Sequence, residues 1–173
     1  MAEILVAYFS ATGTTGAVAA SLADAIEADL YEIKPEVPYT NEDLNWRNEE
    51  SRSSVEMKDP MSRPAIGGLK IPAKAMRTYK TIFLGFPIWW YKAPTIVNTF
   101  LESYDLHGMR IVLFATSGSS GFGGTVEGLE DSAPGAQITE GEILNGFKTK
   151  ADFFDFAKLE AFKYLAEEAG RTG

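Results

Sequence analysis

The chain alternates between short apolar runs and segments in which apolar residues recur at helical spacing. Runs rich in β-branched and aromatic residues, typical of buried parallel strands, lie at 4–9, 30–33, 81–86, 111–115 and, more weakly, 136–139. Apolar residues three or four positions apart indicate helices over 16–28, 94–104, 124–131 and 153–168. Strands that alternate with helices predict an α/β fold, with a parallel sheet, right-handed crossovers and helices on both faces.

Residues 35–70 break this alternation. The segment is polar and charged, contains four prolines, and is far longer than the roughly 12 to 15 residues beyond which a structureless loop is unusual. It also carries apolar residues that can hold it against the rest of the protein, namely Tyr39, Leu44, Trp46 and Met57. We therefore predict one domain over residues 1–173, with a long, partly ordered insertion or flap at 35–70.

Composition excludes several classes of site and partner. The 173 residues include no cysteine, which excludes disulfides, thiolate metal sites and cysteine nucleophiles, and we expect no metal site. A formal net charge of −8 disfavours nucleic acid as a partner, because contact with phosphates needs basic residues. No segment approaches the roughly 18 apolar residues of a membrane span, and no signal peptide is evident. We expect a cytoplasmic protein that does not bind membranes.

A loop rich in hydroxyl groups follows the first apolar run and leads into the first helix. It contains Ser10, Thr12, Gly13, Thr14 and Thr15. The first turn of a helix offers unpaired backbone N–H groups and a positive dipole end, and the hydroxyls add donors, so the pattern favours an anion site. The loop contains no Lys or Arg and no second glycine, which argues against a P-loop and a dinucleotide fold and favours a monophosphate. The alternative is that these residues are ordinary turn and cap residues.

Two further loops follow the third and fourth predicted strands. The first contains three consecutive aromatic residues, which cannot all face the core, and it includes Pro87, Ile88, Trp89 and Trp90. The second is rich in glycine and hydroxyl groups, so a planar ligand could approach its backbone closely, and it begins with Thr116, Ser117, Gly118 and Ser119. A packed corner and a flexible connector are the respective alternatives. In a parallel sheet the loops after these strands converge at one edge, where ligands bind.

These three loops, in this order, resemble those of the flavodoxin family. Residues 10–15 match the family's phosphate-loop pattern [ST]-x-T-G-x-T, and residues 87–90 and 116–119 occupy the places of the two loops that flank the flavin ring. The resemblance implies a doubly wound five-stranded parallel sheet in the order 2-1-3-4-5, with FMN as the cofactor. It also implies that amides of residues 117–119 can donate to the pyrimidine edge of the flavin. Neither flanking loop contains Asp or Glu, and only Phe122 stands where electron-transfer flavodoxins commonly place a tyrosine.

Two functions follow from this resemblance, and neither requires a catalytic side chain. The first is a low-potential electron carrier between redox partner proteins. The second is an NAD(P)H-dependent quinone or nitroaromatic reductase, in which the flap and Trp89–Trp90 shape a substrate pocket. The glycine-rich loop has no basic residue and only Lys92 flanks the aromatic one, so we expect little direct reduction by NAD(P)H unless Arg47, Arg52 or Arg63 of the flap supplies charge.

Overall fold

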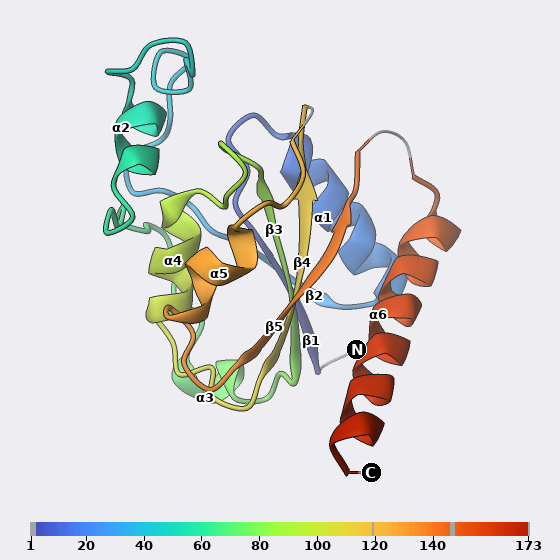
Figure 1. Ribbon diagram of the computed structural model, residues 1–173. Helices are drawn as coiled ribbons and strands as arrows, with labels where there is room; N and C mark the ends of the chain where they lie inside the picture. The colour runs from blue at the N-terminus through green and yellow to red at the C-terminus, as the bar shows by residue number, and fades with distance from the viewer. Residues whose placement is uncertain (1–2, 119, 146–147, 173) are drawn as a thin grey trace.

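The computed structural model describes residues 3–118, 120–145 and 148–172, with backbone only for residues 162–172. Its five strands form one parallel sheet in the order β2-β1-β3-β4-β5 (Figure 1). The strands are β1 (Ile4–Tyr8), β2 (Asp29–Glu32), β3 (Thr81–Pro87), β4 (Arg110–Thr116) and β5 (Gln137–Ile143). This topology confirms the predicted fold class, and β5 continues further than the weak apolar run at 136–139 indicated.

Helices cover both faces of the sheet (Figure 1). On one face lie α1 (Thr14–Ile26) and α6 (Lys150–Thr172), and on the other α4 (Thr95–Glu102) and α5 (Thr125–Glu130). Helix α6 begins before the predicted start at residue 153, because Thr149 and Asp152 cap it reciprocally: each backbone N–H donates to the other's side-chain oxygen, at 2.8 and 3.1 Å. The short helices α2 (Arg52–Lys58) and α3 (Ala73–Met76) were not predicted.

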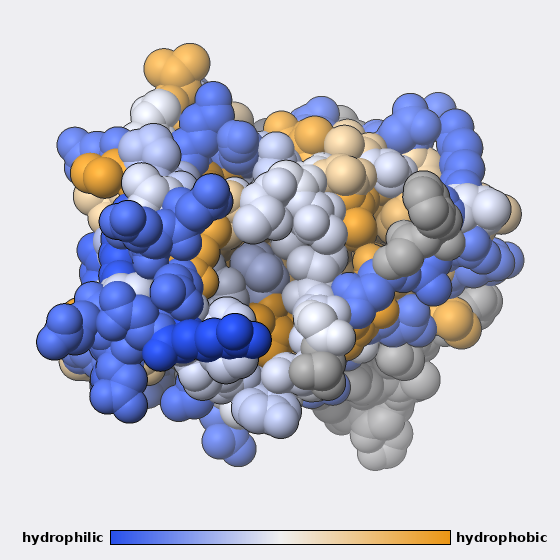
Figure 2. All heavy atoms as spheres, turned by 90° about the horizontal axis from the view of Figure 1, so that it is seen from above, coloured by the Kyte–Doolittle hydropathy of each residue, from blue (hydrophilic) through white to orange (hydrophobic). Residues whose placement is uncertain are grey.

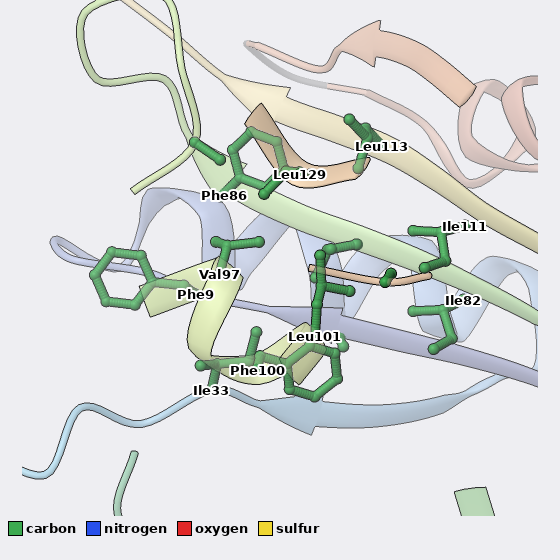
Figure 3. Close-up of a cluster of buried hydrophobic side chains, with 14 of the residues drawn as sticks. Phe9, Ile33, Ile82, Phe86, Val97, Phe100, Leu101, Ile111, Leu113 and Leu129 are labelled. Atoms are coloured by element: carbon green, nitrogen blue, oxygen red, sulfur yellow. The ribbon is translucent and has the colours of Figure 1, made fainter. Parts of the chain in front are cut away.

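Two hydrophobic cores hold these layers together. Successive side chains of a strand point to opposite faces, so Val6 packs beneath α1 and α6, whereas its neighbours Leu5 and Ala7 belong to the other core. Figure 3 shows that second core, in which side chains of α4 and α5 meet those of the strands: Phe9, Ile33, Ile82, Phe86, Val97, Phe100, Leu101, Ile111, Leu113 and Leu129. Burying one such side chain is worth about 1.5–3 kcal/mol.

The flap, residues 35–70, leaves the sheet after β2 and carries α2 (Figure 1). An antiparallel bridge between Pro35 and Ile66 closes its base. Tyr39 packs against the core, and Leu44 and Met57 are half-buried, which agrees with their predicted role. Trp46 was wrongly predicted as an anchor, because its side chain is 64% exposed and lies outside both cores.

Within the part of the chain that the structure describes, no helix is both long enough and apolar enough to cross a bilayer.

Candidate functional site

Three loops extend from the carboxyl ends of β1, β3 and β4 at one end of the sheet (Figure 1). The strand order reverses between β1 and β3, and the loops there run to opposite faces of the sheet, the arrangement in which ligands of such folds bind. Seen from above, this end of the molecule is hollowed at its centre, with pale side chains of intermediate hydropathy around hydrophobic ones (Figure 2). The predicted convergence of the loops is therefore observed.

The first of them, the hydroxyl loop of residues 10–15, presents donors at the start of α1. Gly13, with a φ of 95°, forms the N-cap without a side-chain hydrogen bond, and its N–H donates to Ser10 Oγ at 3.0 Å. Glycine is favoured here because it adopts this left-handed backbone without strain. Lack of space is not the reason, because a Cβ at this position would meet nothing within 4 Å. The hydroxyls of Thr12 and Thr14 lie 3.4 Å apart, both residues are exposed, and the first turn of α1 has no acidic side chain. The loop thus offers neutral donors to an anion.

Thr15 differs from its neighbours in this loop. It is buried, and its hydroxyl lies 2.8 Å from that of Thr116 at the end of β4, 101 positions away along the chain. The Thr15 side chain therefore joins the hydroxyl loop to the third loop. Contact of Thr15 with an anion stays a prediction.

The second loop contains a tight reverse turn, which we call the aromatic turn, residues 89–92. Trp89 and Lys92 exchange backbone hydrogen bonds of 2.9 and 3.0 Å, and the two residues between them have positive φ angles, 49° at Trp90 and 62° at Tyr91. Such a turn normally takes Asn-Gly, because side chains with a Cβ are strained there. Strain of this kind persists only where the surroundings impose it, and it is frequent at functional sites.

The three consecutive aromatic residues of this turn do not all face the core, as their sequence predicted. Trp89 packs edge-on against Phe9 and Tyr39, with ring centroids 5.8 and 5.6 Å away. Trp90 and Tyr91 are instead 44% and 58% exposed. Of the two indoles, Trp90 is therefore the more exposed, and Trp89 is half-buried.

Pro87 and Ile88 lie beside this turn at the end of β3 and are half-buried. The N–H of Ile88 donates to the carbonyl of Thr116 at 2.9 Å. This bond holds the second loop beside the third, so the side-by-side arrangement of both loops is part of the sheet's own hydrogen bonding.

The third loop, residues 116–124, which we call the glycine loop, is held by a residue that the sequence did not reveal. The backbone N–H of Ser117 donates to Asn145 Oδ1 at 2.9 Å, and Asn145 Nδ2 donates to the Ser117 carbonyl at 2.6 Å. Asn145 follows β5, and a lone asparagine in a loop gives no signal of such a pairing. Gly118 is exposed, and Ser119 lies outside the described residues.

Phe122 does not fill the place of a stacking tyrosine. Its side chain is 6% exposed and belongs to the core below α5. Gly123 instead contacts the aromatic turn: a Cβ there would lie 2.6 Å from Tyr91 Cβ, so only glycine permits this approach. The glycine loop and the aromatic turn are therefore packed against each other.

Two arginines of the flap are held in ion pairs. Arg52 stacks over the Tyr39 ring at 3.8 Å and pairs with Glu56 at 3.0 Å, while Arg63 pairs with Glu102 at 2.9 Å. Burial raises the pKa of the Tyr39 phenol, and its hydrogen bond to Glu56 raises it further, so the phenol stays protonated and donates. These contacts fix the flap and commit two of its arginines to structure.

A groove lies between the flap and the aromatic turn. Its volume is about 680 Å³, and we call it the flap groove. Of the three flap arginines Arg47, Arg52 and Arg63, Arg47 is the one that lines the flap groove. The full lining is Trp46, Arg47, Glu49, Ser54, Met57, Lys58, Trp90 and Lys92. Trp90 thus belongs to the second loop and also lines the flap groove.

Comparisons with known proteins agree with this fold. A protein-family model described as flavodoxin matches residues 3–159. A protein from Bacteroides eggerthii, assigned as a flavoprotein, has a crystal structure with a TM-score of 0.82 and 45% identity, covering 92% of this chain and 98% of that one. A flavoprotein from Lactobacillus acidophilus, crystallised in complex with FMN, matches with a TM-score of 0.64 and 20% identity, covering 82% of this chain and 92% of that one. An oxidised flavodoxin from Bacillus cereus matches with a TM-score of 0.53 and 18% identity, covering 93% of this chain and 99% of that one. No curated protein matches the chain.

Proposed function

The chain belongs to the flavodoxin family, whose model matches residues 3–159, and from this premise we propose that it binds FMN and transfers electrons. The observation that carries the proposal is the pair of exposed hydroxyls of Thr12 and Thr14 at the start of α1. They lie beside the switch point of the sheet, where ligands of such folds bind. The Lactobacillus acidophilus flavoprotein of the same fold was crystallised with FMN.

The donors of the hydroxyl loop suit the terminal phosphate of FMN. Thr12, Thr14 and the free N–H groups of the first turn of α1 are neutral, and no acidic side chain in that turn repels an anion. Gly13 adds no side chain over the helix end, so the ligand can approach the backbone. A single phosphate needs no lysine here, because the helix dipole favours its charge.

The other two loops provide the walls for the flavin ring. Trp90 of the aromatic turn offers an exposed indole on one side, and the backbone of Gly118 lies open on the other. We do not assign the Ser117 amide to the flavin ring, as the resemblance implied, because this N–H already donates to Asn145. Within the described part of the loop, the Gly118 amide is the donor we assign to the flavin edge.

When bound, the flavin supplies reversible electron transfer, while the protein supplies binding, orientation and the surroundings of the ring. Trp90 excludes water from one side of the ring, which strengthens the hydrogen bonds that tune its potential. No side-chain acid or base is assigned. The chain's one histidine, His107, lies in the turn before β4, at the end of the sheet opposite the three loops.

FMN binding is tested by comparing FMN with riboflavin, which lacks the phosphate. The purified protein is expected to retain FMN after desalting. Thr12→Val and Thr14→Val should each weaken FMN by about 1.5–3 kcal/mol, the value of a hydrogen bond to a charged group, and leave riboflavin affinity unchanged. Thr78→Val, which removes an exposed hydroxyl near α3, is the matched control. Equal losses for both ligands, or no retained flavin, would contradict the proposal.

The electron-carrier role is tested separately. After anaerobic chemical reduction, the FMN-loaded protein should pass electrons to a one-electron protein acceptor such as cytochrome c. Direct reduction by NADH or NADPH, followed as bleaching of the flavin absorbance, is expected to be slow or absent.

The flap groove favours a second candidate, an NAD(P)H-dependent quinone or nitroaromatic reductase. Its lining contains Arg47 and Lys58 in addition to Lys92, so it can hold a charged substrate beside Trp90. Fast bleaching by NADH or NADPH, coupled to quinone turnover, would establish the reductase and overturn the carrier role.

A further inference from the structure

We propose that the flap groove binds a planar aromatic anion, a small molecule that stacks on tryptophan and places its negative group among three cations. This deepens the proposed function, and it rests on it only in placing the ligand beside bound FMN. The groove is concave, and its volume of about 680 Å³ is typical of small-molecule sites, which span about 300–1,000 Å³.

The first argument is the exposure of two indoles in one groove. Trp46 is 64% and Trp90 44% exposed, although tryptophan is normally well buried. They come from separate elements, the flap and the aromatic turn, and Trp90 is held outward by a backbone with positive φ. Two exposed rings that line one cavity suit a ligand with a planar π face, because stacked aromatic pairs are favourable beyond their buried area.

The second argument is charge. Arg47, Lys58 and Lys92 line the groove, against the single carboxylate of Glu49, in a chain whose formal net charge is −8. Among the residues that the structure describes, none of these three cations forms an ion pair. This separates them from Arg52 and Arg63, which pair with carboxylates of the protein. The groove is thus a positive site on an acidic protein, which favours an anion.

The third argument is preorganisation. The Arg47 guanidinium lies over the Trp46 ring, 5.1 Å from its centroid, and Lys58 Nζ donates to the carbonyl of Glu49 at 3.3 Å. Both cations are therefore held at the groove by neutral partners, which leaves their charge for a ligand. A protein partner is a poorer fit, because the two indoles face a concavity instead of a flat surface.

The test uses two planar quinones that differ in charge, 1,4-naphthoquinone-2-sulfonate and neutral 2-methyl-1,4-naphthoquinone. Binding is measured by calorimetry on the FMN-free and the FMN-loaded protein, and quenching of tryptophan fluorescence is followed in parallel. The sulfonate is expected to bind both forms at least tenfold more tightly than the neutral quinone. Raising the salt concentration should reduce this preference.

Variants separate the two halves of the site. Arg47→Gln and Lys58→Gln should each lower the preference for the sulfonate several-fold, because each removes one cation. Trp46→Ala should weaken both quinones, because it removes a stacking surface; the residue is exposed, so the fold should survive. Lys74→Gln on α3 removes a lysine far from the groove and is the matched control.

Equal affinity for the two quinones, or affinities that none of the groove variants changes, would overturn the proposal. Binding that requires FMN and is unaffected by Trp46→Ala would overturn it too, since the quinone would then stack on the flavin. Loss of FMN binding with sulfonate binding intact would contradict the proposed function alone and leave the groove proposal standing.

Discussion

Replacing Tyr91 by glycine is expected to leave the protein more stable than replacing it by alanine. Tyr91 has a φ of 62°, in the left-handed region, and its side chain is 58% exposed. A residue with a Cβ loses about 1–2 kcal/mol in this conformation relative to an unstrained one. Glycine avoids that strain but loses about 0.5–1 kcal/mol more conformational entropy on folding.

Relative to alanine, the balance for glycine is about 0–1.5 kcal/mol in the free energy of unfolding, which for a chain of this length corresponds to at most about 6 °C in Tm. Both substitutions lose the packing of the Tyr91 side chain, so the comparison isolates the backbone. The hydrogen bond from the Thr125 hydroxyl to the residue 91 carbonyl, 3.3 Å long, involves the backbone and is retained. Urea unfolding and thermal unfolding of the FMN-free protein measure the two quantities.

Two controls isolate the backbone effect. Tyr91→Ala removes the same side chain but keeps the Cβ, so it keeps the strain and should not stabilise. Lys92→Gly, one position on and without a positive φ, relieves no strain and should destabilise by about 0.5–1 kcal/mol. If Tyr91→Gly were no more stable than Tyr91→Ala, the strain argument for the aromatic turn would be wrong.

Two further predictions concern the contacts that join the loops. Thr15→Val replaces a buried hydroxyl by a methyl group and leaves the Thr116 hydroxyl without its partner, so it should lower the free energy of unfolding by about 1–3 kcal/mol in urea titrations. Adding Thr116→Val should recover much of the loss, and failure to do so would show that the hydroxyl pair is not the cause. Asn145→Ala removes both hydrogen bonds to Ser117 and should weaken FMN and riboflavin equally, measured by fluorescence titration, because the phosphate is not involved. A loss confined to FMN would contradict this placement.

The sequence determined the architecture and the position of the site. Burial leaves a local periodicity, so strands and helices could be located from runs of neighbouring residues, and the family resemblance supplied the strand order. The carboxyl ends of parallel strands share one edge, so the motif at residues 10–15 and the loops after residues 86 and 115 had to meet. The short helices α2 and α3 escaped prediction because seven and four residues are too few to show a helical period.

The tertiary structure alone decided which partner each side chain of the candidate site contacts. Thr15 resembles its neighbours in sequence, yet its hydroxyl pairs with Thr116, 101 positions away. Trp46 looked like an anchor and is exposed, and Trp90 is exposed whereas Trp89 packs against Phe9 and Tyr39. The flap groove joins residues 46–58 to residues 90–92, which no local pattern relates. Periodicity reports only whether a side chain is buried, whereas its partner is chosen by how distant segments pack together.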